Sequence, residues 1–171
     1  MKTKKIYVLP YDSQWKQDFE EIRRELADAL GDLTLGIEHV GSTSVEGLAA
    51  KPIIDIDVVI SDHTPLEAVI SALARIGYQH EGNLGIPQRE AFCYDGKSHL
   101  RKHHMYVCPE SSPELRRHIA FRNYLRTHPE EAAEYGQVKM EGAELYPEDI
   151  DGYIAHKSGF ISAIYRRCGL E

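Results

Sequence analysis

Two aspartates interrupt a stretch of sequence that otherwise looks like a buried strand. Residues 53 to 60 read IIDIDVVI, so Asp55 and Asp57 stand two positions apart among aliphatic residues. Because side chains alternate across a strand, the even positions form one wholly apolar face and the odd positions bring both acids to the other. The two Cα atoms would lie ~6.6 Å apart, and the carboxylates would repel each other unless a cation lay between them or one took up a proton.

A divalent metal ion would remove that repulsion. Magnesium, or manganese in its place, binds a few carboxylates together with water and substrate phosphates, so an Asp-x-Asp strand supplies half of a phosphoryl-transfer site. The pattern predicts that Asp55 and Asp57 are metal ligands and catalytic residues. The alternative is a half-exposed strand whose acids are only solvated, because such a strand would show the same alternation.

Four small residues ahead of this strand could bind a phosphate. They follow a strand candidate at 37–40 and precede a turn or short helix expected over 45–51. Glycine lets the backbone approach an anion closely, while hydroxyl and free N–H groups face it; an ordinary turn with a capping hydroxyl is the alternative. The spacing is not that of a Walker A loop, which excludes P-loop chemistry. The four residues are Gly41, Ser42, Thr43 and Ser44.

Two adjacent histidines, His103 and His104, begin another strand candidate. Neighbouring side chains in a strand point to opposite faces, so one histidine could face the site and donate to a phosphate or exchange a proton near neutral pH. Together with His99, Cys93 and Cys108 the pair also suggests zinc, but the spacing matches no common zinc pattern. The zinc interpretation is therefore the weaker one.

Several basic residues could neutralise the phosphates of a bound anion. Arginine suits this role best, because its guanidinium group binds two oxygen atoms at once. Each of these residues taken alone is also typical of a solvated surface. The candidates are Lys51, Arg89, Arg101, Arg122, Lys139 and Lys157.

The elements that must position these residues follow from alternating helical and strand patterns. Thr64 and Glu67 form a possible capping box around Pro65, which we expect at the first helical position. Together, the expected helices and strands predict a single mixed α+β domain over residues 1–171. Its small mixed sheet would be packed by helices, with further helices at the C-terminus. The expected helices span 12–30, 64–76, 113–127, 129–142 and 148–167, and the expected strands span 37–40, 53–60, a few residues near 78, 89–95 and 103–108, the last two as a hairpin.

The composition is that of a soluble globular protein, with 42% hydrophobic and 27% charged residues. No segment approaches the ~20 apolar residues of a membrane span, and the N-terminus lacks the apolar stretch of a signal peptide. We expect a cytoplasmic protein whose three cysteines are reduced. A formal net charge of −7 argues against broad binding of nucleic acid, while the basic fragments at 96–104 and 116–126 suit a small anionic ligand.

Several stretches span nearly the whole chain in a characteristic order: IEHVGSTSVEGLAAKPIIDIDV, IPQREAF, HHMYV, HIAFRNYLR and the Tyr-x-x-x-Lys pairs at 135–139 and 153–157. In this order they resemble the GrpB family of the nucleotidyltransferase superfamily. The resemblance implies a nucleotidyltransferase-like fold, found alone or fused to dephospho-CoA kinases. It also implies a nucleoside triphosphate or other phosphorylated small molecule as the ligand, with Mg²⁺ or Mn²⁺ as its metal.

The resemblance carries over to particular residues. It places Gly41 and Ser42 at the turn that contacts phosphate, and Asp55 and Asp57 at the metal positions. Among the basic candidates it favours two arginines, because they lie inside family-like stretches. The expected phosphate-binding set is Gly41, Ser42, Thr43, Ser44, Lys51, Arg89, Arg122 and Lys139.

One expected part is missing from the sequence. Active members of the superfamily usually bring a third acidic residue from a later strand, where this chain has His104 and Tyr106, with Glu90 as a substitute. We expect His104 to complete the catalytic residues of a Mg²⁺-dependent nucleotide-binding protein, a nucleotidyltransferase with an unidentified acceptor. The alternatives are a catalytically silent nucleotide-binding or regulatory module of the same fold and, less favoured, a metal-dependent phosphohydrolase.

Overall fold

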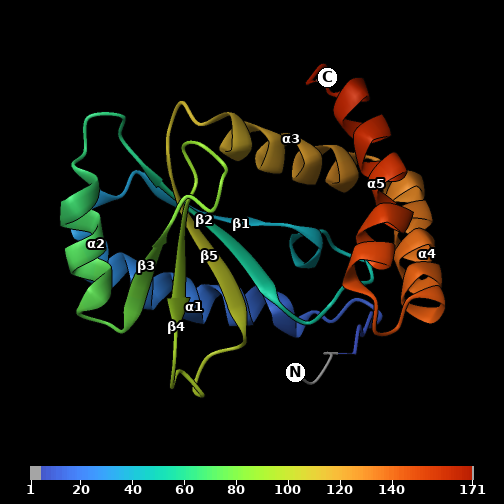
Figure 1. The fold of residues 1–171 in the computed structure, drawn as a ribbon, viewed down its shortest axis with the longest axis horizontal. Helices are drawn as coiled ribbons and strands as arrows, with labels where there is room; N and C mark the ends of the chain where they lie inside the picture. Colours follow the sequence, from blue (N-terminus) through green and yellow to red (C-terminus); the bar gives the residue numbers. More distant parts are fainter. Residues whose placement is uncertain (1–4, 171) are drawn as a thin grey trace.

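A five-stranded sheet forms the centre of the computed structural model, which describes residues 5–170 (Figure 1). Its order is β1-β2-β5-β4-β3, with β2 and β5 parallel and the other neighbours antiparallel. The expected mixed α+β fold, including the β4–β5 hairpin, is thereby confirmed. The strands are β1 (Gly36–Val40), β2 (Ile54–Ile60), β3 (Tyr78–Gly82), β4 (Glu90–Tyr94) and β5 (His103–Pro109).

Helices cover the sheet unequally. Buried side chains of α1 and α2 pack against one face, and α3 contacts β1 and β5 from the other. The last two helices, α4 and α5, pack against each other at one end of the molecule (Figure 1). Across residues 5–170, no helix has the length and apolar character needed to cross a membrane. The helices are α1 (Gln14–Leu30), α2 (Leu66–Ala74), α3 (Pro113–Thr127), α4 (Pro129–Leu145) and α5 (Ile150–Arg167).

The main core lies between the even face of β2 and the helix α1. Ile54, Ile56 and Val58 are fully buried there, in one cluster with Trp15 and Ile22 of α1. The apolar residues of α1 recur at helical spacing and so form a single stripe toward the sheet. Burying the even face leaves the odd face of β2, with both aspartates, directed to the opposite side of the sheet.

A second, smaller apolar cluster ties the C-terminal helices to the loop that follows β1. It joins Val45 and Leu48 of that loop to Leu125 of α3 and to Ala132 and Tyr135 of α4. Packing of this kind is close and rigid, so it fixes where side chains of α4 and α5 point. The cluster therefore holds the two helices beside the ends of β1 and β2.

The turn expected over 45–51 is present, at residues 46 and 47, and the N–H of Leu48 donates to the carbonyl oxygen of Val45 there. A 3₁₀ turn at Ser42–Ser44 precedes it, because Gly41 with φ 73° lets the chain turn directly after β1. One local expectation was wrong. The helix α2 begins only after Pro65, whose ψ of 123° is extended, and no side chain caps it. Thr64 therefore forms no capping box.

The even face of β2 should carry much of the stability. We expect Ile56→Ala to lower the free energy of unfolding by about 3 kcal/mol, because it leaves a cavity in a fully packed core. The matched change Ile154→Ala, at a side chain 49% exposed, should stay within about 0.5 kcal/mol. Urea unfolding of both variants measures the difference, and equal losses would contradict the assignment of the core.

Candidate functional site

The parallel pairing of β2 and β5 assembles the polar face of the sheet. In this register Asp55 lies beside His104 and Asp57 beside Tyr106. On the other side of β2, Glu38 of β1 lies opposite Asp57. Directly paired residues project to the same face of a sheet, so these five side chains share the face that α1 and α2 leave uncovered.

Asp55 lies at the edge of the turn that follows β1. The φ of Gly41 is 73°, and a Cβ atom at this position would overlap the Oδ2 atom of Asp55. Two reasons therefore require glycine at position 41: the backbone has a positive φ, and the carboxylate of Asp55 approaches too closely for a side chain. The other carboxylate oxygen, Oδ1, lies 3.4 Å from Nδ1 of the partly exposed His104.

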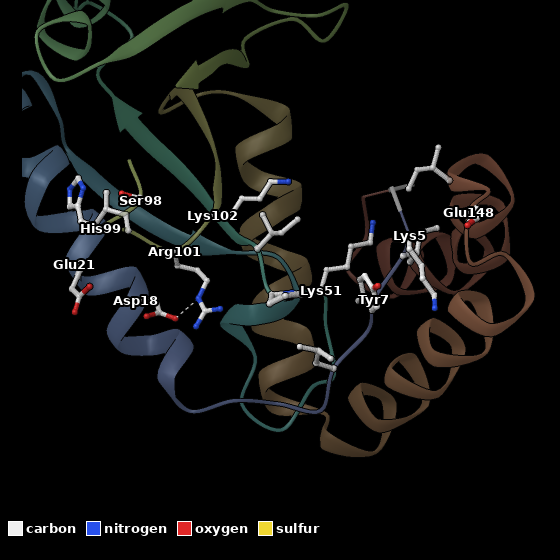
Figure 2. A pocket seen from close by; sticks show the side chains of 16 residues that line it. Lys5, Tyr7, Asp18, Glu21, Lys51, Ser98, His99, Arg101, Lys102 and Glu148 are labelled. Carbon is white, nitrogen blue, oxygen red and sulfur yellow. Dashed lines mark hydrogen bonds and ion pairs between the residues drawn. The ribbon is translucent and has the colours of Figure 1, made fainter. Parts of the chain in front are cut away.

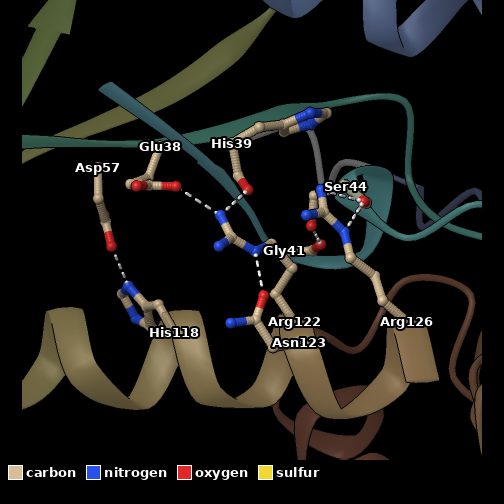
Figure 3. A network of polar contacts seen from close by, with 9 residues as sticks. All are labelled: Glu38, His39, Gly41, Ser44, Asp57, His118, Arg122, Asn123 and Arg126. Carbon is tan, nitrogen blue, oxygen red and sulfur yellow. Dashed lines mark hydrogen bonds and ion pairs between the residues drawn. The ribbon is translucent and has the colours of Figure 1, made fainter. Parts of the chain in front are cut away.

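Asp57 is completely buried and shows an uneven set of contacts (Figure 3). Its Oδ2 atom lies 2.6 Å from Nδ1 of His118 on α3, whereas its Oδ1 atom has no hydrogen-bond partner. Burial by itself lowers the pKa of His118, but the hydrogen bond and charge of Asp57 outweigh it and raise that pKa. The contact with Asp57 therefore favours the protonated form of His118.

His118 begins a stripe of three cations along α3, spaced four residues apart on one helix face (Figure 3). Arg122 donates to Oε2 of Glu38 at 2.7 Å and to the carbonyl oxygen of His39 at 3.0 Å. Arg126 donates through Nε and Nη2 to the carbonyl oxygen of Ser44, at 3.0 and 2.8 Å. The stripe connects α3 to β1, β2 and the turn between them.

A small polar cavity of about 220 Å³ opens beside Asp55. It lies where the turn after β1, the start of β2 and the two C-terminal helices meet. Its composition is unusual because three lysines face a single acid. The residues that line this polar cavity are Ser42, Thr43, Ala50, Lys51, Ile53, Asp55, His104, Lys139, Tyr153 and Lys157.

Lys139 is the most deeply buried charge-bearing group of the polar cavity. Its side chain is 2% exposed and its Nζ atom has no hydrogen-bond partner, although it lies 4.5 Å from the centre of the Tyr135 ring. Burial, followed by the nearby charge of Lys157, lowers the pKa of Lys139 to about 6. Burial and the charge of Lys51 lower the pKa of Lys157 to about 8. An anion in the cavity would favour the charged form of both lysines.

The structure brings together only part of the site expected from the sequence. Asp57 is not one of the residues that line the polar cavity, whereas Asp55, His104 and several of the expected phosphate-binding residues are. The hydroxyl of Ser44 instead donates to the carbonyl oxygen of Gly41, and that of Thr43 lies 2.9 Å from Nε2 of His39. The members of the expected set in the cavity lining are Ser42, Thr43, Lys51 and Lys139.

Two favoured arginines lie outside the polar cavity. Arg122 is engaged by Glu38 and the backbone of β1, as described above. Arg89 stacks over the ring of Tyr106, 4.3 Å from its centre, and its buried Nε atom has no partner. Of the other acids and bases considered, Glu90 pairs with His80 and Arg101 with Asp18.

Sequence reasoning missed the partners of the two strand acids. His118 was not among the candidates, although basic residues at positions 118, 122 and 126 recur every fourth residue within one predicted helix. Glu38 was missed because its place opposite Asp57 depends on the register of β1 and β2. Lys157 was considered as a phosphate ligand, but only the packing of α5 shows that it faces Asp55.

The residues present fit a metal ion only if the ligand supplies part of its coordination. Among the described residues, no group of three or more His, Cys, Asp or Glu side chains is arranged to hold a metal, so neither zinc nor a three-acid centre is preformed. Asp57 nevertheless keeps one buried, unpartnered oxygen on the same face as Asp55. Magnesium commonly binds through one or two carboxylates plus substrate phosphates, which is the donor set available here.

The Asp57–His118 pair should make stability depend on pH. We expect His118→Ala to lower the free energy of unfolding by about 3 kcal/mol at pH 6, because it leaves a buried carboxylate unpaired. Since the pKa of His118 is raised in the folded state, its contribution is complete below the unfolded pKa of about 6.5 and is lost as the pH rises through the folded pKa. Urea unfolding at pH 6 and pH 9 without divalent metal tests this. His63→Ala, at an exposed histidine, is the control, and equal losses at both pH values would contradict the pair.

Lys139 should have the opposite effect on stability. Its pKa is lowered in the folded state, so the unfolded chain binds more protons and the penalty is largest at and below pH 6. We therefore expect Lys139→Met to raise the free energy of unfolding of the ligand-free protein by about 1–4 kcal/mol at pH 6, and by less at pH 9. The exposed Lys16→Met should change little. A destabilised Lys139→Met protein would show that this lysine has a partner in solution.

Comparison with known proteins identifies the relatives of this chain. Residues 5–167 match the family model described as GrpB protein. The UPF0157 protein YqkA of Bacillus subtilis is 33% identical over 158 residues, which make up 92% of this chain but 46% of that protein. The chain thus spans less than half the length of this relative. A crystal structure of the conserved protein GrpB from Enterococcus faecalis has a TM-score of 0.83 at 36% identity, covering 95% of this chain and 96% of that one.

More distant solved structures share only the fold. The GLD-2/RNP-8 complex matches with a TM-score of 0.61 at 12% identity, over 94% of this chain and 62% of that one. The Cid1 poly(U) polymerase bound to MgATP matches with a TM-score of 0.53 at 12% identity, over 75% of this chain and 41% of that one. Both likenesses place the sheet and its helices among nucleotidyltransferase-like folds. The chain belongs to the GrpB family.

Proposed function

We propose that the polar cavity binds the phosphates of a nucleoside triphosphate as its Mg²⁺ complex, and that the protein transfers a nucleotidyl group from it to an acceptor. The observation that carries this proposal is the buried, unpartnered Nζ of Lys139, which faces one acid together with Lys51 and Lys157. Three lysines face one carboxylate here, and a bound polyphosphate would favour the charged form of the lysines and be neutralised by them. The solved Cid1 polymerase with bound MgATP, which shares the fold, supports the choice of ligand.

Each group in the cavity has a distinct task in this proposal. The three lysines bind the phosphate oxygens, and the backbone of Gly41 and Ser42 lies close enough to Asp55 to approach the same anion. Asp55 and the free oxygen of Asp57 would hold Mg²⁺, which would neutralise charge on the phosphates and orient them for in-line displacement. His104, paired with Asp55, would accept the proton of the attacking acceptor group.

A second candidate, a silent nucleotide-binding module, is favoured by one observation. At the β5 positions beside Asp55 and Asp57 the chain carries His104 and Tyr106, and the described residues supply no third acid there. A protein of this kind would bind the same ligand without turnover. The two candidates share the binding step and differ only in the release of pyrophosphate.

Thermal unfolding with each nucleoside triphosphate tests the binding step. In the presence of Mg²⁺, and with the triphosphate at about 100 times its own dissociation constant, we expect it to stabilise the native protein by about 2.7 kcal/mol. The reason is that the triphosphate binds only the folded state. The double variant Asp55→Asn/Asp57→Asn should lose the magnesium-dependent part of the shift. The control Asp28→Asn/Asp32→Asn, at two exposed acids, should keep it.

The outcomes separate the candidates. An equal shift without metal, or in the Asp55→Asn/Asp57→Asn protein, would rule out the two-acid metal site. No shift with any of the triphosphates would rule out the proposed ligand. Where binding is found, release of pyrophosphate in the presence of an acceptor supports transfer over the silent module.

A further inference from the structure

A second and much larger cavity borders the polar cavity. Its volume is about 1050 Å³, which is close to the upper end of the range typical of sites for small organic molecules. The two cavities share Lys51 and Ile53 in their linings, so a molecule in the larger one can extend toward the lysines and Asp55. We call it the apolar cavity, because its floor and walls are formed by the side chains of Ile6, Tyr7, Leu9, Pro52, Ile53, Leu100 and Ile150.

The chain holds the walls of the apolar cavity in place by backbone hydrogen bonds. The N–H of Ile6 donates to the carbonyl oxygen of Pro147 at 2.7 Å, which ties the N-terminal segment to the connection between α4 and α5. Leu9 and Ala50 exchange two hydrogen bonds of 2.9 Å, which tie the same segment to the chain before β2. The N-terminal segment thus connects the chain before β2 with the connection between α4 and α5, along one side of the cavity.

The charged side chains of the apolar cavity lie on two sides of it, with Lys51 and Lys102 between them (Figure 2). On the α1 side Arg101 is paired with Asp18, at 2.9 Å, and on the other side Lys5, Tyr7 and Glu148 lie near the C-terminal helices. Three acids, Asp18, Glu21 and Glu148, offset most of the positive charge in the lining. Such a lining attracts a polyanion less than the lysine-rich polar cavity does.

The apolar lining also restricts the chemistry of the occupant. Tyr7, Leu9 and Ile150 are 58%, 43% and 48% exposed, so three large apolar side chains are presented to the same space. A nucleobase is read through hydrogen bonds, which the aliphatic floor cannot offer, whereas an acyl chain or a carbocyclic ring system would lose little by leaving water. The cavity therefore suits the body of a molecule that has few polar groups.

We propose that the apolar cavity binds the acceptor of the transfer reaction, a small molecule with an acyl or aromatic body and one anionic or hydroxyl end that reaches Lys51. This inference rests on the proposed function, because it takes the polar cavity as the place of the triphosphate. In the reaction an acceptor hydroxyl oxygen forms a bond to the α-phosphorus, the bond from that phosphorus to pyrophosphate breaks, pyrophosphate leaves, and the hydroxyl proton passes to His104. An anionic acceptor oxygen would attack in the same way with no proton to transfer. The apolar side chains of the lining favour an acyl or aromatic body over the charged backbone of RNA.

Binding of 1-naphthyl phosphate, measured by isothermal titration calorimetry, tests the inference. We expect this probe to bind at least about tenfold more tightly than inorganic phosphate, because its ring leaves water for the apolar cavity. The double variant Tyr7→Ser/Ile150→Gln, which adds no charge and changes two exposed side chains, should remove most of this advantage. The control Leu84→Gln, at a side chain 61% exposed and outside the cavity lining, should keep it.

Three results would overturn the inference. The first is that 1-naphthyl phosphate binds no more tightly than inorganic phosphate, or equally well to the double variant. The second is that the double variant weakens MgATP but leaves magnesium tripolyphosphate unchanged, which would assign the cavity to the nucleoside. The third is that a uridine decanucleotide binds more tightly than 1-naphthyl phosphate, which would favour RNA. If the first or the third result is found, an unchanged MgATP shift in the double variant would show that the failure concerns the acceptor and leaves the proposed function intact.

Discussion

The buried carboxylate of Asp57 sets the arrangement of the polar side of this molecule. An ionised carboxylate removed from water costs several kcal/mol unless a cation and hydrogen bonds compensate it. His118 supplies both to one oxygen, and this requires α3 to lie across β1 and β2. With α3 in that position, Arg122 and Arg126 reach Glu38 and the carbonyl oxygen of Ser44. One ion pair therefore positions the helix, and the helix holds the turn that carries Gly41.

In the polar cavity, by contrast, basic side chains lack acidic partners among the described residues. Lys51, Lys139 and Lys157 converge from the chain before β2 and from two helices without enough acids to pair them. Burial, followed by the charge of a neighbouring lysine, lowers the pKa of Lys139 to about 6 and that of Lys157 to about 8. Groups that destabilise a ligand-free protein in this way are characteristic of binding sites, where stability is given up for function. The adjoining apolar cavity extends the same region toward a neutral, apolar occupant.

Features encoded within a few neighbouring residues could be predicted from the sequence. The alternation in IIDIDVVI placed Asp55 and Asp57 on one face of β2, and Gly41 was expected at a close approach of backbone to the site. Predictions that depended on distant partners were less complete. Arg122 lies in a stretch shared with the family, yet Glu38 and the backbone of His39 engage its guanidinium outside the polar cavity.

The sequence by itself determined the family, the mixed α+β fold, the apolar face of β2 and the pair of acids on its other face. These follow from local periodicity, in which each residue's side is set by its own position in the strand or helix. Only the tertiary structure decided that one acid is paired with His118 while the other faces three lysines, and that an apolar cavity adjoins them. Those relations join residues as far apart in the chain as Ile6 and Ile150, and they depend on strand register and helix packing, which local patterns do not specify.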